Sequence, residues 1–140
     1  MSGNGEDNRL IYIIMADFGT AYGWTKRDGA IDKYGVGGNH ADSVGWLGEH
    51  EIPEELHKEF VGWQGPFERS DVYEEDEAAK FPWEEFNKKG LELCRKLKAV
   101  LGDEVRVCYE KAHEEHPYAD EHERQEVLLD GSIVGWKLSK

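Results

Sequence analysis

Residues 82–102 read PWEEFNKKGLELCRKLKAVLG, and this stretch carries the strongest helical pattern in the chain. Phe86, Leu93 and Leu97 recur at helical spacing, which predicts one buried face. Gly102 is typical of the residue that follows a helix C-terminus. The stretch therefore predicts an amphipathic helix of about five turns, which needs an apolar layer to pack against.

Strands predicted on both sides of this helix supply that layer. Arg9–Ala16 is an almost unbroken apolar run and predicts a buried strand, and Ala21–Arg27 predicts a second one. Val105–Tyr109 predicts a strand directly after the helix. Residues 126–129 and 132–138 predict a closing hairpin. An Asp-Gly dipeptide, which suits a tight hairpin turn, follows residue 27 and residue 129.

The middle of the chain is less regular. Pro53–Trp63 predicts a second amphipathic helix, and Gly65 and Pro66 are expected to end it. Residues 31–48 are rich in glycine without a clear period, so we expect a loop there with a short strand near Val44–Trp46. The polar stretch that follows the second helix predicts a solvated loop or a short exposed helix.

These elements predict an α+β fold, with a mostly antiparallel sheet and two amphipathic helices packed on one face. Residues 1–8 are polar and predict a disordered N-terminus. Residues 9–140 predict a single domain, since no repeat or linker divides them.

Charge and composition limit the function. The chain has 140 residues, 30 Asp and Glu against 17 Lys and Arg, a net charge of -13 and 11% aromatic residues. Disordered acidic tails lack aromatic residues, so this composition predicts a core. Phosphate backbones and anionic membranes repel such a charge, so we expect no direct nucleic-acid or membrane partner. Cys94 and Cys108 are expected to be buried thiols of a cytoplasmic protein, since no leader or membrane-length apolar run is found.

Acidic residues concentrate at 49–59, 68–77 and 103–126. A surface of carboxylates attracts basic partners, and aromatic side chains within it, Trp63 among them, would supply apolar anchors. The alternative is that the acidity only keeps the protein soluble. The predicted partner-binding residues are Glu68, Asp71, Tyr73, Glu74, Glu75, Asp76, Glu77, Trp83, Glu114, Glu115, Tyr118, Asp120, Glu121 and Glu123.

A different class of function rests on Asp17-Phe18-Gly19-Thr20, which lies between two predicted strands. This pattern resembles the first phosphate loop of the actin, sugar-kinase and heat-shock ATPase superfamily, and the opening strand of RNase H-like nucleases. The resemblance implies a Mg²⁺-dependent enzyme that uses Asp17 and Thr20, with Glu110 as a further carboxylate. Against it, the predicted C-terminal hairpin replaces the helix of those nucleases, and Gly19 also suits a bend in a hairpin.

Metal and cofactor motifs give no comparable signal. His113 and His116 are three residues apart and Pro117 follows, whereas the zinc-peptidase helix spaces its histidines by four. Residues 35–38 are glycine-rich but lack the Lys-Ser/Thr of a phosphate-binding loop. We therefore expect no metal site and no cofactor.

Three stretches give the whole chain a family likeness: WEEFN at 83–87 with the leucines after it, LGDEVRV at 101–107 and VLLDGS at 127–132. In these it resembles the small acidic immunity proteins of bacterial polymorphic or contact-dependent toxin systems. The resemblance implies a non-catalytic inhibitor that covers the cationic active site or nucleic-acid groove of a toxin or nuclease. A phage-encoded nucleic-acid mimic that inhibits a host defence nuclease would use the same physics, and the sequence leaves both open.

Overall fold

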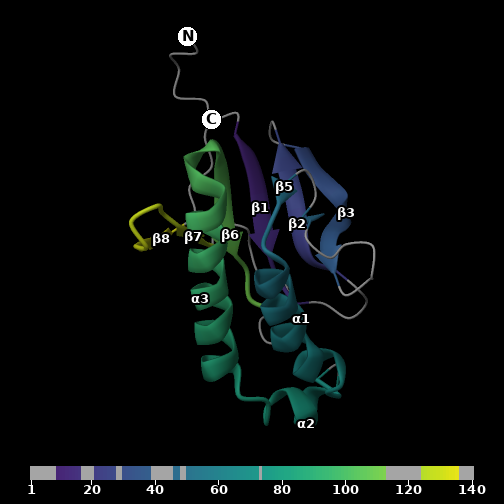
Figure 1. Cartoon of the computed structure of the whole chain (residues 1–140). Helices are drawn as coiled ribbons and strands as arrows, with labels where there is room; N and C mark the ends of the chain where they lie inside the picture. Colours follow the sequence, from purple (N-terminus) through teal and green to yellow (C-terminus); the bar gives the residue numbers. More distant parts are fainter. Residues whose placement is uncertain are drawn as a thin grey trace.

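A computed structural model describes residues 9–16, 21–27, 30–38, 46–47, 50–72, 74–112 and 124–135. Figure 1 shows helices on one side of a twisted sheet. The strands are β1 (Leu10–Ile14), β2 (Ala21–Arg27), β3 (Ala30–Gly38), β4 (Trp46–Leu47), β5 (His50–Glu51), β6 (Val105–Tyr109), β7 (Gln125–Val127) and β8 (Ile133–Gly135). The helices are α1 (Glu54–Glu68), α2 (Glu75–Ala78) and α3 (Trp83–Leu101), and a 3-10 turn, η2 (Gly102–Glu104), follows α3.

The main sheet has six strands in the order β3-β2-β1-β6-β7-β8. Neighbouring strands are antiparallel except β1 and β6, which run parallel with Leu10 opposite Val105 and Ile14 opposite Tyr109. Parallel neighbours need a long connection, and the chain between β1 and β6 contains β2 to β5 and the three helices. The predicted α+β fold with a mostly antiparallel sheet is confirmed.

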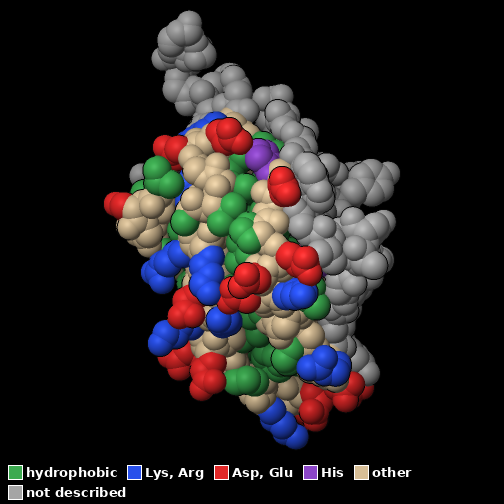
Figure 2. All heavy atoms as spheres, viewed as in Figure 1, with side chains coloured by type: hydrophobic (Ala, Val, Ile, Leu, Met, Phe, Trp, Pro, Cys, Tyr) green, Lys and Arg blue, Asp and Glu red, His purple; other side chains and the backbone are tan. Residues whose placement is uncertain are grey.

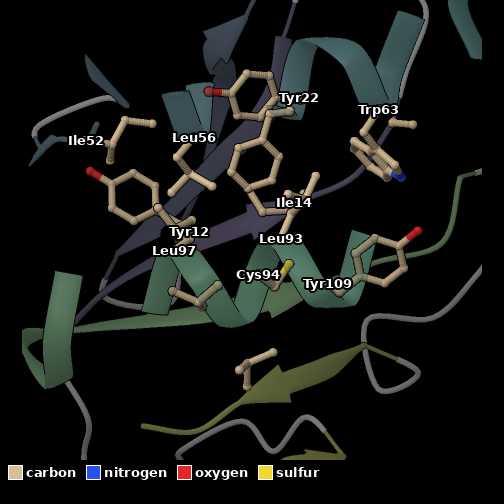
Figure 3. Packing of buried hydrophobic residues seen from close by; sticks show 14 of the residues in the cluster. Tyr12, Ile14, Tyr22, Ile52, Leu56, Trp63, Leu93, Cys94, Leu97 and Tyr109 are labelled. Atoms are coloured by element: carbon tan, nitrogen blue, oxygen red, sulfur yellow. The ribbon is translucent and has the colours of Figure 1, made fainter. Parts of the chain in front are cut away.

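The core lies between the sheet and the helices (Figure 3). Tyr12 and Ile14 of β1 belong to the large cluster that also contains Leu93 of α3, and all three are fully buried. Ile11 and Ile13 lie on the opposite face of the sheet and are buried as well. Burial on both faces explains why β1 is an apolar run rather than an alternating one.

Helix α3 spans Trp83–Leu101, as the periodicity predicts, and it buries Phe86, Leu93 and Leu97. Gly102 follows it with φ of +75°, in the region that favours glycine. The closing hairpin is also confirmed, although β7 and β8 are shorter than predicted within the described residues. Its turn places Gly131 at φ of +89°. None of the described helices combines the length and apolarity needed to cross a membrane.

Helix α1 continues to Glu68, so the prediction that Gly65 and Pro66 end it is wrong. Proline in the last turn removes one hydrogen bond and crowds the preceding turn. Phe67 compensates because it is fully buried and stacks on Phe86, with 5.9 Å between ring centroids. Tertiary packing thus overrides a local helix-ending signal.

The loop predicted over 31–48 is also wrong in part, because β3 occupies Ala30–Gly38. β3 pairs with β2 from Ala30 opposite Arg27 to Gly38 opposite Ala21, with a register shift between Trp24 and Lys26. Pairing along the whole strand compensates for the low strand preference of its glycines. The short strand expected near residue 46 is β4, which pairs with β5.

Candidate functional site

An aromatic cluster lies at the end of the core where the chain runs from α1 through α2 to α3. Phe67, at the end of α1, packs edge-on against Phe81, with ring centroids 6.2 Å apart. Phe81 in turn lies against Trp83, with centroids 4.5 Å apart, and edge-on to Phe86 at 5.2 Å. Aromatic pairs at these distances attract each other beyond the area they bury. The segment between α1 and α3, which contains α2, therefore packs on this aromatic cluster.

Trp83 connects α2 to the aromatic cluster by a hydrogen bond. Its Nε1 donates a hydrogen bond to the carbonyl oxygen of Ala78, the last residue of α2, at 2.7 Å. Val72, before α2, is buried in the same core. Backbone bonds from Ala78 N to Glu74 O (2.9 Å) and from Ala79 N to Glu75 O (3.1 Å) close the turn itself. The short helix is therefore held by side-chain packing at both of its ends.

Carboxylates cover the outer surface of this segment, and Figure 2 shows them at the lower end of the molecule, over α2. Lys80 Nζ lies 3.5 Å from Glu77 Oε2, whereas no described cation pairs with Glu74, Glu75 or Asp76. We call the following exposed residues the acidic platform: Asp71, Glu74, Glu75, Asp76 and Glu77. Like charges held together in this way create a strong local potential for a basic partner.

The structure brings five of the predicted partner-binding residues together in the acidic platform, and Trp83 lies directly beneath it. Glu68 is the last residue of α1, but its side chain lies outside the described part of the chain. The remaining predicted residues also fall outside the described part: Tyr73, Glu114, Glu115, Tyr118, Asp120, Glu121 and Glu123.

Trp63 and Trp83 are not exposed, which differs from the exposed aromatic side chains that the sequence suggested. Trp63 is only 6% exposed, stacks on Phe86 and donates from Nε1 to the Phe86 carbonyl oxygen at 2.9 Å. Trp83 is half-buried and its N–H bonds Ala78. Both indoles are therefore used to build the core.

The alternative catalytic residues are only partly visible. Asp17 and Thr20 lie outside the described residues, whereas Glu110 directly follows β6 and its backbone N–H donates to the Ile14 carbonyl oxygen at 2.9 Å. The Glu110 side chain is 8% exposed, and its carboxylate accepts a hydrogen bond from Arg124 Nε. Within the described ranges, no group of three or more His, Cys, Asp or Glu is arranged to hold a metal ion.

A buried ionic layer on the second face of the sheet was not foreseen from the sequence. Arg106 of β6 makes a two-pronged contact with Glu126 of β7, with Nη2 to Oε1 at 2.7 Å and Nε to Oε2 at 2.9 Å. Both residues are 7% exposed. Arg124 and Glu110 form a second, largely buried pair, and Cys108 of β6 is fully buried. Strand alternation was the available signal, because Arg106 and Cys108 share one face of β6.

The thiols of Cys94 and Cys108 are both buried, as expected. Burial raises the pKa of each thiol well above its usual range, and the thiolate is therefore strongly disfavoured. Because the thiolate is the nucleophile of cysteine chemistry, neither side chain is suited to nucleophilic catalysis.

Two histidines outside the predicted sites form structural hydrogen bonds. His50 Nδ1 lies 2.7 Å from the buried Tyr12 hydroxyl, and its Nε2 lies 3.0 Å from an oxygen of the exposed Glu104. His57 Nδ1 lies 2.9 Å from the hydroxyl of Tyr22. Each histidine thus ties a segment outside the main sheet to a tyrosine of β1 or β2.

A search of known protein families, of curated proteins and of solved structures finds no match to this chain.

Proposed function

We propose that this chain is a non-catalytic inhibitor that neutralises a basic toxin or nuclease domain, in the manner of an immunity protein. The observation that supports the proposal is the acidic platform, a group of exposed carboxylates on a segment fastened to the aromatic cluster. In the inhibited complex the platform covers the cationic active site or nucleic-acid groove of the partner. Its carboxylates take the place of phosphate groups there.

The fixed backbone beneath the platform matters for affinity. Ordering a flexible loop on binding costs free energy, and a segment already held by Trp83 and Phe81 avoids much of that cost. The clustered charge mainly accelerates association, since long-range attraction orients the partner before contact. The same surface would serve a phage-encoded inhibitor of a host defence nuclease, and the identity of the partner distinguishes the two.

The experiment uses the full chain as bait in lysate of its native host. Binding at about 50 mM salt is followed by elution at about 500 mM, because salt screens exposed charge pairs. A released basic protein is identified by mass spectrometry, purified, and its association and dissociation rates with the chain are measured. The test variant neutralises three platform carboxylates: Glu74→Gln, Glu75→Gln and Glu77→Gln.

The matched control removes the same charge elsewhere on the exposed surface: Glu51→Gln, Glu55→Gln and Glu92→Gln. We expect the platform variant to associate about tenfold more slowly, with a smaller change in dissociation rate, and the control to behave like the natural chain. Equal association rates for the two variants would remove the platform from the interface. A partner that is not basic would contradict the proposed function itself.

An enzyme is the second candidate, and the parallel pairing of β1 and β6 is the observation that favours it. Asp17 follows β1 in sequence and Glu110 follows β6, and the carboxyl ends of adjacent parallel strands meet at one edge of a sheet. In the described contacts, however, Arg124 holds the Glu110 carboxylate, and catalysis would require this pair to separate.

The enzyme hypothesis has its own test. The purified chain is incubated with nucleoside triphosphates and with single- and double-stranded nucleic acids, with Mg²⁺ or Mn²⁺. Hydrolysis that Asp17→Asn abolishes, with the fold intact by circular dichroism, would support the enzyme. Absence of hydrolysis, or activity equal in the Asp17→Asn variant, would reject it.

A further inference from the structure

A groove of about 800 Å³ lies between α3 and residues at or beside the ends of β6 and β8. It opens on the side of α3 away from α1, and Trp83 lines one end of it. Figure 2 shows basic and acidic side chains interspersed over α3. The residues that define the groove are Glu84, Lys88, Leu91 and Arg95 of α3, with Lys111 and Ile133 opposite.

The α3 residues of the groove lie on one face of the helix, because positions 84, 88, 91 and 95 are spaced by four, three and four residues. Lys88 and Arg95 are two turns apart, which separates them by about 10.5 Å along the helix axis. Leu91 lies between them and, with Ile133, forms a half-buried apolar floor.

The charge of the groove is opposite to that of the chain. Three cations and one carboxylate line it, although the net charge of the protein is -13. On the neighbouring face of α3, Lys89 and Lys96 both pair with Glu59, with Nζ to Oε2 at 3.8 and 2.8 Å.

Lys88 and Arg95 are not neutralised in that way. No described carboxylate pairs with Lys88, and Arg95 uses its Nε to bond the carbonyl oxygen of Gly131 at 3.0 Å. That bond holds the Arg95 side chain across the groove without cancelling its charge. An anionic group that enters the groove therefore meets Lys88 and Arg95, with which no described carboxylate pairs.

We propose that this groove binds a short acidic segment of a partner protein, with two carboxylates about 10 Å apart and apolar side chains between them. The carboxylates bind Lys88 and Arg95, and the apolar side chains contact Leu91 and Ile133. Glutamates three positions apart in a polyproline II peptide lie on the same side of the peptide, about 9 Å apart, because that helix has three residues per turn and rises about 3.1 Å per residue. The inference does not depend on the proposed inhibitor function, because the groove and the acidic platform attract opposite charges.

The test titrates the acetylated, amidated peptide Glu-Leu-Leu-Glu into the ¹⁵N-labelled full chain and follows amide chemical shifts. We expect saturable shifts along α3 and near residues 111 and 133. The groove variant is Lys88→Glu/Arg95→Glu, and the matched control is Lys89→Glu/Lys96→Glu, on the same helix with the same charge change. Affinity should fall about tenfold or more in the groove variant, because two charged contacts are lost, and change less than twofold in the control.

Three results would overturn the proposal. Equal weakening in both double variants would show that only net charge attracts the peptide. Equal binding of the peptide Lys-Leu-Leu-Lys would show that the groove cations do not select carboxylates. Inorganic phosphate that produces the same shifts with the same affinity as the acidic peptide would assign the groove to small anions instead of a protein segment.

Discussion

Gly90 of α3 and Tyr109 of β6 approach so closely that a Cβ atom at position 90 would lie 2.4 Å from Tyr109 Cε1. The same atom would lie 3.0 Å from Trp63 Cζ2. Tyr109 cannot easily move aside, because its hydroxyl donates to Asn87 Oδ1 at 2.5 Å. This contact allows α3 to lie against the sheet at the level of the aromatic cluster.

Gly90→Ala should therefore destabilise the protein although alanine favours helices. The helix preference contributes about 1 kcal/mol and overpacking costs about 1–3 kcal/mol, so we expect a net loss of up to about 2 kcal/mol in the free energy of unfolding. Urea denaturation measures it. The control is Gly62→Ala in α1, where nothing lies within 4 Å of the added Cβ. A stabilised Gly90→Ala variant would show that Tyr109 yields.

Trp83→Phe tests whether the indole N–H fastens the acidic platform. The variant keeps an aromatic ring but loses the bond to the Ala78 carbonyl oxygen, which is worth about 1 kcal/mol. We expect faster amide hydrogen exchange at Ala78 and Ala79, with little change in the middle of α3. Trp63→Phe, which removes a bond to Phe86 instead, should lack this selective effect. Unchanged exchange at Ala78 in Trp83→Phe would mean that packing alone holds α2.

The sequence predicted correctly those helices and strands whose signals lie within their own residues. Helix α3 carries its own periodicity and terminal glycine, and β6 carries strand-forming residues, Val105, Val107 and Tyr109, between polar residues. β3 does not, because its glycines adopt a strand only through pairing with β2. The end of α1 also depends on a distant contact, that of Phe67 with Phe86.

The candidate site also combines features that the sequence shows directly with features that depend on contacts between distant residues. The carboxylates at 74–77 are evident in the sequence, since charge is a property of composition. Their attachment to the core through Trp83 depends on side-chain packing, and the sequence instead suggested an exposed indole. The parallel pairing of β1 with β6 and the groove beside α3 likewise arise from segments distant in sequence.

Arg106 and Glu126 should contribute to the free energy of unfolding cooperatively, so that losing one residue costs more when the other is still present. Arg106→Met leaves the Glu126 carboxylate buried without its main partner and should cost about 3–5 kcal/mol. Arg106→Met/Glu126→Leu removes both charges and should be more stable than the single variant. Urea denaturation of the natural chain, both single variants and the double variant gives the coupling energy.

The exposed Lys80–Glu77 pair serves as a control, since Lys80→Met should cost less than about 1 kcal/mol. Additive effects of Arg106→Met and Glu126→Leu would contradict the coupling.

His57 should make stability depend on pH near neutrality. Its side chain is 2% exposed, and burial lowers the pKa of the imidazole from its usual 6.5, with Glu54 opposing the shift. The unfolded chain therefore binds the proton more readily than the folded one. The stability contributed by neutral His57 is fully present above pH 6.5 and is lost as the pH falls through the lowered pKa of the folded state.

We expect the free energy of unfolding to decrease between pH 7 and pH 5, and to decrease less in His57→Gln, whose amide can still bond the Tyr22 hydroxyl. Urea titrations at four pH values across this range measure the difference. Asp103 does not interfere, because its hydrogen bond from Lys98 lowers the pKa of its carboxyl, so it titrates at more acidic pH. Other histidines contribute equally to both proteins and cancel in the comparison. Parallel pH profiles for the two proteins would show that His57 accepts its proton as readily in the folded state as in the unfolded one.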